Sequence, residues 1–500
     1  MYLKGDMYAI KHLIFQQQRL QGNSDEQYAS ARTRWPLLTM FGVLTCDRHF
    51  TIADGVKDVH IVGLSLVNGL AHDGLGIVAE GGGCVLMGQN ASLSLLNVTF
   101  QNCHANYDGS MEPTSSGRGG AVFVGALSTL VVKDSVIRDC SSGRHGGGLY
   151  SDTHSHLEML GVVFQSLAAG VCVDRPEVCI SIDWIDEYGD DCDFYAANPM
   201  WCGGDSNVMC CACRPPPCEP TGGGGAYFAA SDVSATISNS AFLDCSSNHG
   251  AAMMLSGAVS LFLQDVSMSR NYAHGNGGAL NAANGGNTIS IYGGSVIDNF
   301  AGWEGGGFYV FNSNIDATNL PVIGNNAYKG GGIYLDYATL TLSGSSILDN
   351  MADFGGGVAG ERDSSVTLQG ASACSGNTAV VEGGGLFLRL SSSLTALTSH
   401  INGNRASGVG GGMTVYESSV MLVDSSVSGN TASFVGGGGF LLSSALVAFS
   451  CLIDDNTAAN GGGLFTVDSS LMLRQVQDPF CCQNLDVDDW SILENEDDDL

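Results

Sequence analysis

Residues Gly330–Phe354 read GGGIYLDYATLTLSGSSILDNMADF, and this stretch decides the fold. After the glycines, Ile333 and Leu335 alternate with Tyr and Asp, and Leu340 and Leu342 alternate with Thr and Ser. A third, shorter apolar segment precedes an Asn turn. Alternation with a period of two predicts short strands with one face inward, and no apolar stretch here is long enough for an ordinary helix.

The same frame returns along the chain, and from Gly223 onward its glycine-rich mark recurs every 25 to 28 residues. Such a period indicates stacked coils, and glycine permits positive φ and close backbone approach where each coil turns a corner. We predict an all-β fold, a right-handed parallel β-helix with three short strands per coil and about 13 coils. The marks begin at Gly81, Gly119, Gly146, Gly223, Gly250, Gly277, Gly305, Gly330, Gly355, Gly383, Gly410, Gly436 and Gly461.

An asparagine occupies the same turn position in successive coils. In-register stacking would place these amides one strand spacing apart, where each can bond the copies above and below it. We therefore predict a structural Asn ladder rather than an asparagine-lined ligand groove, formed by Asn271, Asn299, Asn325, Asn350, Asn377, Asn404, Asn430 and Asn456. Toward the N-terminus this position becomes Cys103, Cys140 and Cys245, for which we expect buried free thiols.

Charge narrows the class of partner. The 500-residue chain has 19 Lys and Arg residues against 50 Asp and Glu residues, a formal net charge of −31. Without a basic cluster to neutralise phosphates, nucleic acid is not an expected partner. The acidic surface is expected to keep an elongated particle soluble, with collection of divalent cations as an alternative. No apolar run reaches the roughly 18 residues of a membrane span, so we expect no transmembrane segment.

The spacing divides the chain into a coil stack, two ends and an insertion. We expect an N-terminal cap over residues 1–36, with apolar residues at helical spacing, and the β-helix over residues 37–475. A Cys-rich disulfide module at 171–221 interrupts the stack, and residues 476–500 form an acidic C-terminal cap or tail. Insertions in solenoids map to loops beside the stack, so this module is expected to lie outside it.

Cysteine content indicates an oxidising compartment. Eight of the 17 cysteines lie in the insertion, a density that favours disulfides over a zinc site: Cys172, Cys179, Cys192, Cys202, Cys210, Cys211, Cys213 and Cys218. No export signal is visible at the N-terminus, so an incomplete N-terminus would reconcile the two observations. We expect an extracellular or cell-surface location, where the sequons at Asn90 and Asn97 could carry glycans.

The coil consensus resembles a known repeat. Segments such as SVIDNFAGWEGGGFY and SVSGNTASFVGGGGF resemble the repeats of chlamydial polymorphic outer-membrane proteins, and more broadly right-handed β-helices of the pectin-lyase-like superfamily, over Phe50 to Gln475. The resemblance implies a surface β-helix. The chlamydial proteins carry a signal peptide and a C-terminal membrane barrel, and neither is seen in this sequence, so the resemblance leaves outer-membrane anchoring open. CISIDWIDEYGDDCDFYAANPMWCGGDSNVMCCAC resembles a small extracellular module of marine protists.

No catalytic signature emerges. The Gly-His-Gly and Arg-Ile-Lys motifs of galacturonan hydrolases are absent, and Lys and Arg form no repeated column that would supply a lyase base. Asp residues precede the ladder position, but the spacing of Asp298 and Asp349, two coils apart, favours turn residues over a calcium site. We therefore assign no catalytic, cofactor-binding or metal-binding residues. Calcium binding by the carboxylates of the Cys-rich insertion stays an alternative.

The leading hypothesis is a noncatalytic extracellular or cell-surface protein that acts as a stalk, an adhesin, or a scaffold for glycans or surface proteins. The alternative is a carbohydrate-active enzyme, a polysaccharide lyase or a glycoside hydrolase. The two differ in one observable. An enzyme should bring acidic and basic side chains together on one sheet over neighbouring coils.

Overall fold

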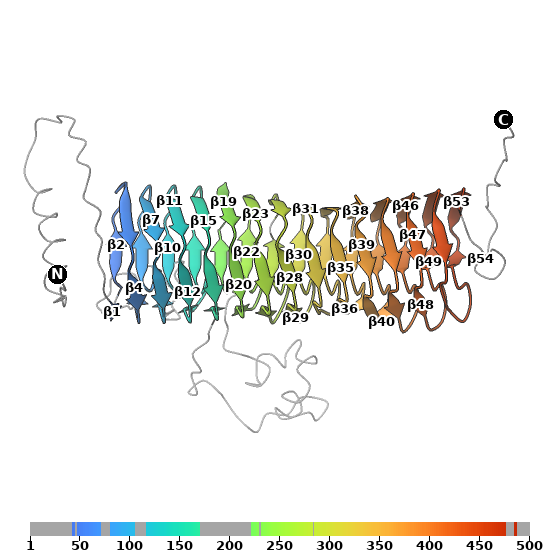
Figure 1. Cartoon of the computed structure of the whole chain (residues 1–500), viewed down its shortest axis with the longest axis horizontal. Helices are drawn as coiled ribbons and strands as arrows, with labels where there is room; N and C mark the ends of the chain where they lie inside the picture. The colour runs from blue at the N-terminus through green and yellow to red at the C-terminus, as the bar shows by residue number, and fades with distance from the viewer. Residues whose placement is uncertain are drawn as a thin grey trace, which may run out of the picture.

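The computed structural model describes residues 43–45, 48–71, 81–105, 117–170, 222–229, 232–283, 285–476 and 485–487. The predicted N-terminal cap, the Cys-rich insertion and most of the C-terminal tail lie outside these residues. The described chain forms a right-handed parallel β-helix, and its coils follow one another along a single axis from the N-terminal to the C-terminal end (Figure 1). All of its paired strands are parallel, and no described residue is helical.

One coil shows how the sequence makes the fold. The segment after the Gly-rich mark forms β33 (Ile333–Asp336), the alternating Thr-Leu segment forms β34 (Thr339–Ser343), and the third apolar segment forms β35 (Ser346–Leu348). Leu340, Leu342 and Ile347 are fully buried in one core shared by the three strands. Burying each such side chain contributes about 1.5–3 kcal/mol, so the inward face of every coil drives the stacking.

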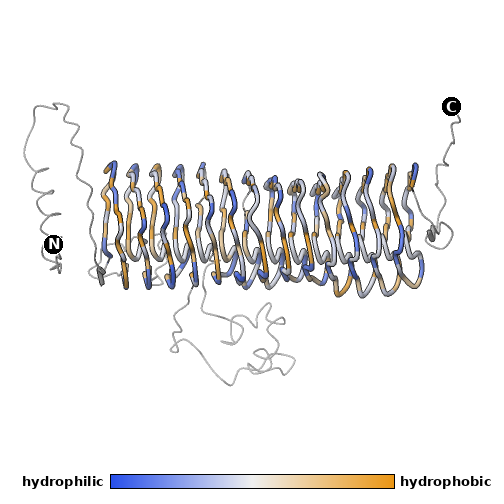
Figure 2. The backbone as a smooth tube through the Cα atoms, in the orientation of Figure 1, coloured by the Kyte–Doolittle hydropathy of each residue, from blue (hydrophilic) through white to orange (hydrophobic). Residues whose placement is uncertain are grey.

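Each of these three strands belongs to a different long sheet. A 15-stranded sheet runs from β2 (Phe50–Ile52) to β54 (Leu485–Val487). The two 14-stranded sheets run from β3 (Val59–Val62) to β53 (Ser470–Arg474) and from β1 (Val43–Thr45) to β51 (Leu452–Asp454). Apolar and polar segments recur at matching places in successive coils (Figure 2).

Many coils have a fourth short strand that the sequence did not predict. It follows the Asn turn and pairs into a seven-stranded sheet from β5 (Leu70–Ala71) to β29 (Phe300–Ala301), and a four-stranded one from β36 (Met351–Phe354) to β48 (Thr431–Ala432). These strands lie along the lower edge in Figure 1. Several are only two residues long, so alternation could not reveal them.

The Gly-rich block forms the corner at the start of each coil. Its first residue has a positive φ, for example 61° at Gly330 and 64° at Gly355. In the first marked coil, however, this residue is Gly82, with a φ of 81°, and the prediction of Gly81 was wrong by one position. Strand register explains the shift, because Val85 pairs with Val122 and the block therefore ends at Cys84.

Cys103 is not a free thiol as expected. It forms a disulfide with Cys84, with Cα atoms 5.6 Å apart. In several coils the last residue of the Gly-rich block faces the ladder residue of the same coil, as shown by Gly332, whose added Cβ would lie 3.3 Å from Asn350. In the first marked coil, both of these positions are cysteine, Cys84 at the end of the block and Cys103 at the ladder position. Cys140 and Cys245 are buried free thiols, and burial raises the pKa of each to about 12.

Candidate functional site

The outer face of the 15-stranded sheet carries the candidate site. Four neighbouring strands build it: β30 (Phe308–Phe311), β33, β37 (Val358–Glu361) and β41 (Leu386–Arg389). Alternation turns their first and third residues into the core, so the second and fourth face outward. The second position forms a row in which Tyr309 stacks on Tyr334, with ring centroids 5.5 Å apart, before Ala359 and Phe387.

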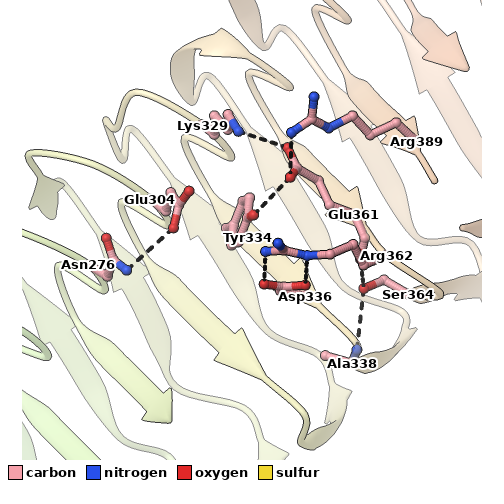
Figure 3. A network of polar contacts seen from close by, with 10 residues as sticks. All are labelled: Asn276, Glu304, Lys329, Tyr334, Asp336, Ala338, Glu361, Arg362, Ser364 and Arg389. Carbon is pink, nitrogen blue, oxygen red and sulfur yellow. Dashed lines mark hydrogen bonds and ion pairs between the residues drawn. The ribbon is translucent and has the colours of Figure 1, made fainter. Parts of the chain in front are cut away.

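Charged side chains converge on this face over consecutive coils (Figure 3). The charged residues come from three kinds of position, which are the residue before the Gly-rich block, the outward end of the strand, and the residue just after it, and Tyr334 joins them from the second position of β33. We call the set the polar cluster, and it comprises Glu304, Lys329, Tyr334, Asp336, Glu361, Arg362 and Arg389.

Glu361 is the centre of the polar cluster. Its Oε1 accepts a hydrogen bond from Nζ of Lys329 at 2.9 Å, and its Oε2 accepts from Nη2 of Arg389 at 2.8 Å. The hydroxyl of Tyr334 donates to the same Oε2 at 3.1 Å. Only 3% of the Glu361 side chain is exposed. Burial alone would raise the pKa of Glu361, but the hydrogen bonds from Arg389 and Lys329 outweigh it and lower the pKa, so this carboxylate stays ionised.

Asp336 forms the second ion pair. Arg362 donates to both of its oxygens, with Nε 2.6 Å from Oδ1 and Nη2 bonded to Oδ2, a bidentate arrangement. The Asp336 side chain is 3% exposed, whereas that of Arg362 is 45% exposed and faces the ring of Tyr337. The hydrogen bonds from Asp336 raise the pKa of the Arg362 guanidinium. Both carboxylates are therefore held by cations that reach the surface.

Glu304 differs from these two carboxylates. Its Oε2 accepts a long hydrogen bond, 3.3 Å, from Nδ2 of Asn276. Burial raises the pKa of Glu304, and although the charge of Lys329 opposes this, the charges of Glu361 and Asp336 add to it. A half-buried carboxyl with a raised pKa beside fixed charges is a typical arrangement of functional sites.

The charge distribution argues that the cluster is more than packing. After Arg270 the sequence contains five Lys and Arg residues, and three of them are in the polar cluster, the others being Arg405 and Arg474. Buried ion pairs are commonly no more stable than apolar residues of similar volume. Other coils fill the same outward positions with aromatic or aliphatic residues, such as Phe440 and Leu442. A stack built for stability alone has no need of this arrangement.

Sequence reasoning missed this site because it looked for basic residues in a single repeated column. Lys329 precedes a Gly-rich block, Arg389 ends a strand, and Arg362 follows one, so the three never share a repeat position. The fold brings them together because each positive-φ glycine turns the chain back over the sheet. The scarcity of basic residues in this half of the sequence was the signal that could have pointed to them.

The predicted ladder asparagines lie in one continuous buried row. In each consecutive pair, Nδ2 donates to Oδ1 of the next coil's asparagine at 2.8–3.0 Å, from Asn271 through Asn456. The backbone N–H also donates to that Oδ1, as in Asn325 to Asn350 at 2.9 Å. These amides lie inside the stack and do not meet the polar cluster.

The other predicted site residues are dispersed. Asn90 and Asn97 are exposed turn residues with φ near 53° and 52°, and Asn90 accepts a hydrogen bond from Lys57. Asp298 and Asp349 have φ of 54° and 53°, as turn residues do. The eight cysteines of the insertion lie outside the described residues. Within those residues, no group of three or more His, Cys, Asp or Glu could hold a metal ion.

Two further polar groups exist on the stack. Near its N-terminal end, His145 stacks on Tyr227 at 4.4 Å, and burial together with the charges of Arg118 and Arg144 lowers the pKa of His145 to about 3. On a 14-stranded sheet, His400 lies 2.9 Å from Ser426 Oγ beside a hollow of about 530 Å³ that Asp424 also lines. Neither group combines fixed acidic and basic side chains as the polar cluster does.

Comparisons with known proteins give no match, whether with protein-family models, curated proteins or solved structures. In the described part of the chain, no helix is long and apolar enough to cross a membrane.

Proposed function

We propose that the chain is a noncatalytic extracellular or cell-surface β-helix protein, a rigid scaffold that binds a glycan or a surface protein on the outer face of its 15-stranded sheet. One observation carries this proposal. The polar cluster gathers acidic and basic groups, but both oxygens of Glu361 and of Asp336 are occupied by bound cations. Side chains fixed in this way suit recognition more than proton transfer, because a general base needs a free lone pair directed at the substrate.

Several features support the surface location. The Cys84–Cys103 disulfide and the density of cysteines in the insertion fit an oxidising compartment. The resemblance of the coils to chlamydial polymorphic outer-membrane repeats, and to pectin-lyase-like β-helices, fits the same role. A stack whose every coil packs on its neighbours is a suitable stalk for the insertion after Gly170.

A carbohydrate-active enzyme is the second candidate, because acidic and basic side chains meet on one sheet over neighbouring coils as an enzyme requires, and Glu304 is the further observation in its favour. This carboxyl has a raised pKa, one weak partner, and a position beside the ion pairs. A proton donor in a glycoside hydrolase or a lyase needs such a raised pKa.

Turnover assays separate the two candidates. The purified chain is incubated with uronate polymers and with neutral glycans, with and without calcium, and new reducing ends and unsaturated products are measured. We expect no release above a boiled control. Product formation that disappears in Glu304→Gln but persists in the matched exposed variant Glu158→Gln would replace the scaffold proposal with the enzyme.

A further inference from the structure

Exposed aromatic side chains gather at one corner of the coil stack. Most large apolar side chains in the described residues are buried, but four aromatic residues on three consecutive coils are open to solvent. We call them the aromatic corner, and their exposed fractions are 44% for Tyr272, 36% for Phe300, 65% for Trp303 and 48% for Tyr328. An exposed apolar patch rimmed by polar groups commonly marks an interaction site.

The backbone holds these rings in two adjacent rows. Tyr272 in β25 (Tyr272–Ala273) pairs in register with Phe300 in β29, and their rings stack with centroids 4.9 Å apart. In the next row, the backbone N–H of Tyr328 donates to the carbonyl of Trp303 at 2.8 Å. Both rows run along the coil axis, and β29 marks their place in Figure 1. The paired coils fix the backbone beneath these residues, so little backbone freedom is lost when a ligand binds.

The aromatic corner adjoins the polar cluster. Trp303 directly precedes Glu304, and Tyr328 directly precedes Lys329, so successive residues supply an exposed ring and a charged group. The carboxyl of Glu304 and the amide of Asn276 form a polar edge beside the rings. This combination of a hydrogen-bonding edge with an aromatic platform suits a ligand that has both hydroxyl groups and apolar C–H faces.

Charge decides which ligand of that kind fits. Two cations adjoin the corner in sequence, and each is paired with a carboxylate: Lys329 with Glu361, and Arg270 with Asp244; the chain as a whole carries −31. Glu304 follows Trp303 in the sequence, and the backbone N–H of Asp353 donates to the carbonyl of Tyr328 from the next coil. These two residues add carboxylates near the aromatic corner. A polyanion would therefore be repelled. A neutral sugar polymer is not repelled, and its pyranose C–H faces can pack on the rings.

Building on the proposed scaffold function, we infer that the aromatic corner binds a neutral polysaccharide chain laid along the coil axis, with sugar rings stacked on Trp303 and Tyr328.

Affinity electrophoresis tests this with the full chain and soluble probes: hydroxyethylcellulose, laminarin and mannan as neutral polymers, and polygalacturonate as an acidic one. Trp303→Ala and Tyr328→Ala remove exposed rings, so the fold should persist, which circular dichroism checks. Phe434→Ala is the matched control, because Phe434 is 64% exposed and holds the same coil position, its N–H donating to Gly408 as that of Trp303 donates to Gly275.

We expect at least one neutral polymer to retard the native chain, with apparent affinity falling roughly tenfold in Trp303→Ala and Tyr328→Ala. Phe434→Ala should leave the retardation unchanged, and polygalacturonate should give none. Retardation that is equal in all variants would overturn the corner as the site while keeping the scaffold function.

Failure of every neutral polymer to bind would overturn the glycan inference. Analytical ultracentrifugation tests the remaining alternative, that the aromatic corner binds a second copy of the chain. A native dimer that Trp303→Ala converts to monomer would assign the corner to a second copy of the chain instead. Turnover of a bound polymer would overturn the noncatalytic function, independently of where the polymer binds.

Discussion

Single residues in the Gly-rich block do different things, and the structure separates their roles. The first glycine supplies a positive φ, whereas the second can lie very close to neighbouring backbone, as Gly356 does, although Ala251 occupies this second position in the coil that begins at Gly250. An added Cβ at Gly356 would lie 2.4 Å from the carbonyl oxygen of Gly384 and 2.5 Å from that of Thr378. Gly403, at a turn with a φ of 64°, has no heavy atom within 4 Å of its added Cβ.

Gly356→Ala and Gly403→Ala therefore form a matched pair. Gly356→Ala places a methyl group against the carbonyl of Thr378 in its own coil and that of Gly384 in the next coil, so we expect a loss of several kcal/mol or a failure to accumulate folded protein. Gly403→Ala meets only the left-handed backbone cost, about 1–2 kcal/mol. Soluble yield and urea midpoints measure both. Equal losses in the two variants would contradict the role of backbone crowding.

At the same scale, sequence reasoning succeeded where one residue recurs and failed where two positions meet. The asparagine ladder was predictable because Asn350 and its equivalents recur at one turn. The Cys84–Cys103 disulfide was not, because it joins a block position to a ladder position across the coil. Predicting this disulfide requires knowing that Val85 pairs with Val122, which places Cys84 at the end of the block. The sequence suggested instead that the block begins at Gly81 and ends at Gly83.

At the scale of elements, the polar cluster contains two carboxyls with opposite pKa shifts, the buried Glu361 at the end of β37 and the half-buried Glu304 before β30. Glu361 has its pKa lowered by its bound cations despite burial, so its ion pairs stabilise the fold above the ordinary pKa of glutamate. That stabilisation is lost as the pH falls through the folded-state pKa. Glu304 has its pKa raised by burial, so its ionisation opposes folding at neutral pH, and stability is gained as the pH falls through its folded-state pKa.

Glu361→Gln and Glu304→Gln should consequently shift stability in opposite directions at pH 7. We expect Glu361→Gln to lower the free energy of unfolding by about 1–3 kcal/mol, less than for a fully buried pair, because Arg389 can turn toward water. Its deficit should shrink as the pH falls from the ordinary glutamate pKa through the lowered folded-state pKa of Glu361, where the native chain loses the same stabilisation.

Glu304→Gln should leave stability unchanged or raise it at pH 7, since it removes the cost of a buried charge. Urea midpoints at several pH values between 3 and 8 test the pair. A Glu304→Gln variant that loses as much stability as Glu361→Gln at pH 7 would show that Glu304 is held by partners as strong as those of Glu361.

The polar cluster also shows why elements were easier to predict than the site they build. Alternation placed Ile333 and Leu335 in the core, and with them Tyr334 and Asp336 on the outer face. Nothing in a period of two indicates that Lys329, before the corner, turns back to meet Glu361 on the next coil. That contact depends on the angle at Gly330, and the segment that leads into it has only isolated bridges at Asn326 and Lys329, which leave no pattern in the sequence.

At the scale of the whole molecule, a solenoid is stabilised by contacts between neighbouring coils, so damage should remain local. The Cys84–Cys103 disulfide joins residues 19 positions apart in the first described coils. Closing a loop of this length stabilises the folded state by about 3 kcal/mol in the chain-entropy account. This stabilisation belongs to the N-terminal end alone, where the solenoid would otherwise begin to open.

The double variant Cys84→Ala/Cys103→Ala removes this link without disturbing the cysteines of the insertion. Alanine suits the first position, because Ala121 occupies it in the next coil. We expect amide hydrogen exchange to accelerate in peptides covering residues 85–101 and to remain unchanged in peptides covering 413–428. Acceleration along the entire stack would mean that the coils unfold as one cooperative unit, and unchanged exchange at both ends would mean that the disulfide adds nothing to the stability of the first coils.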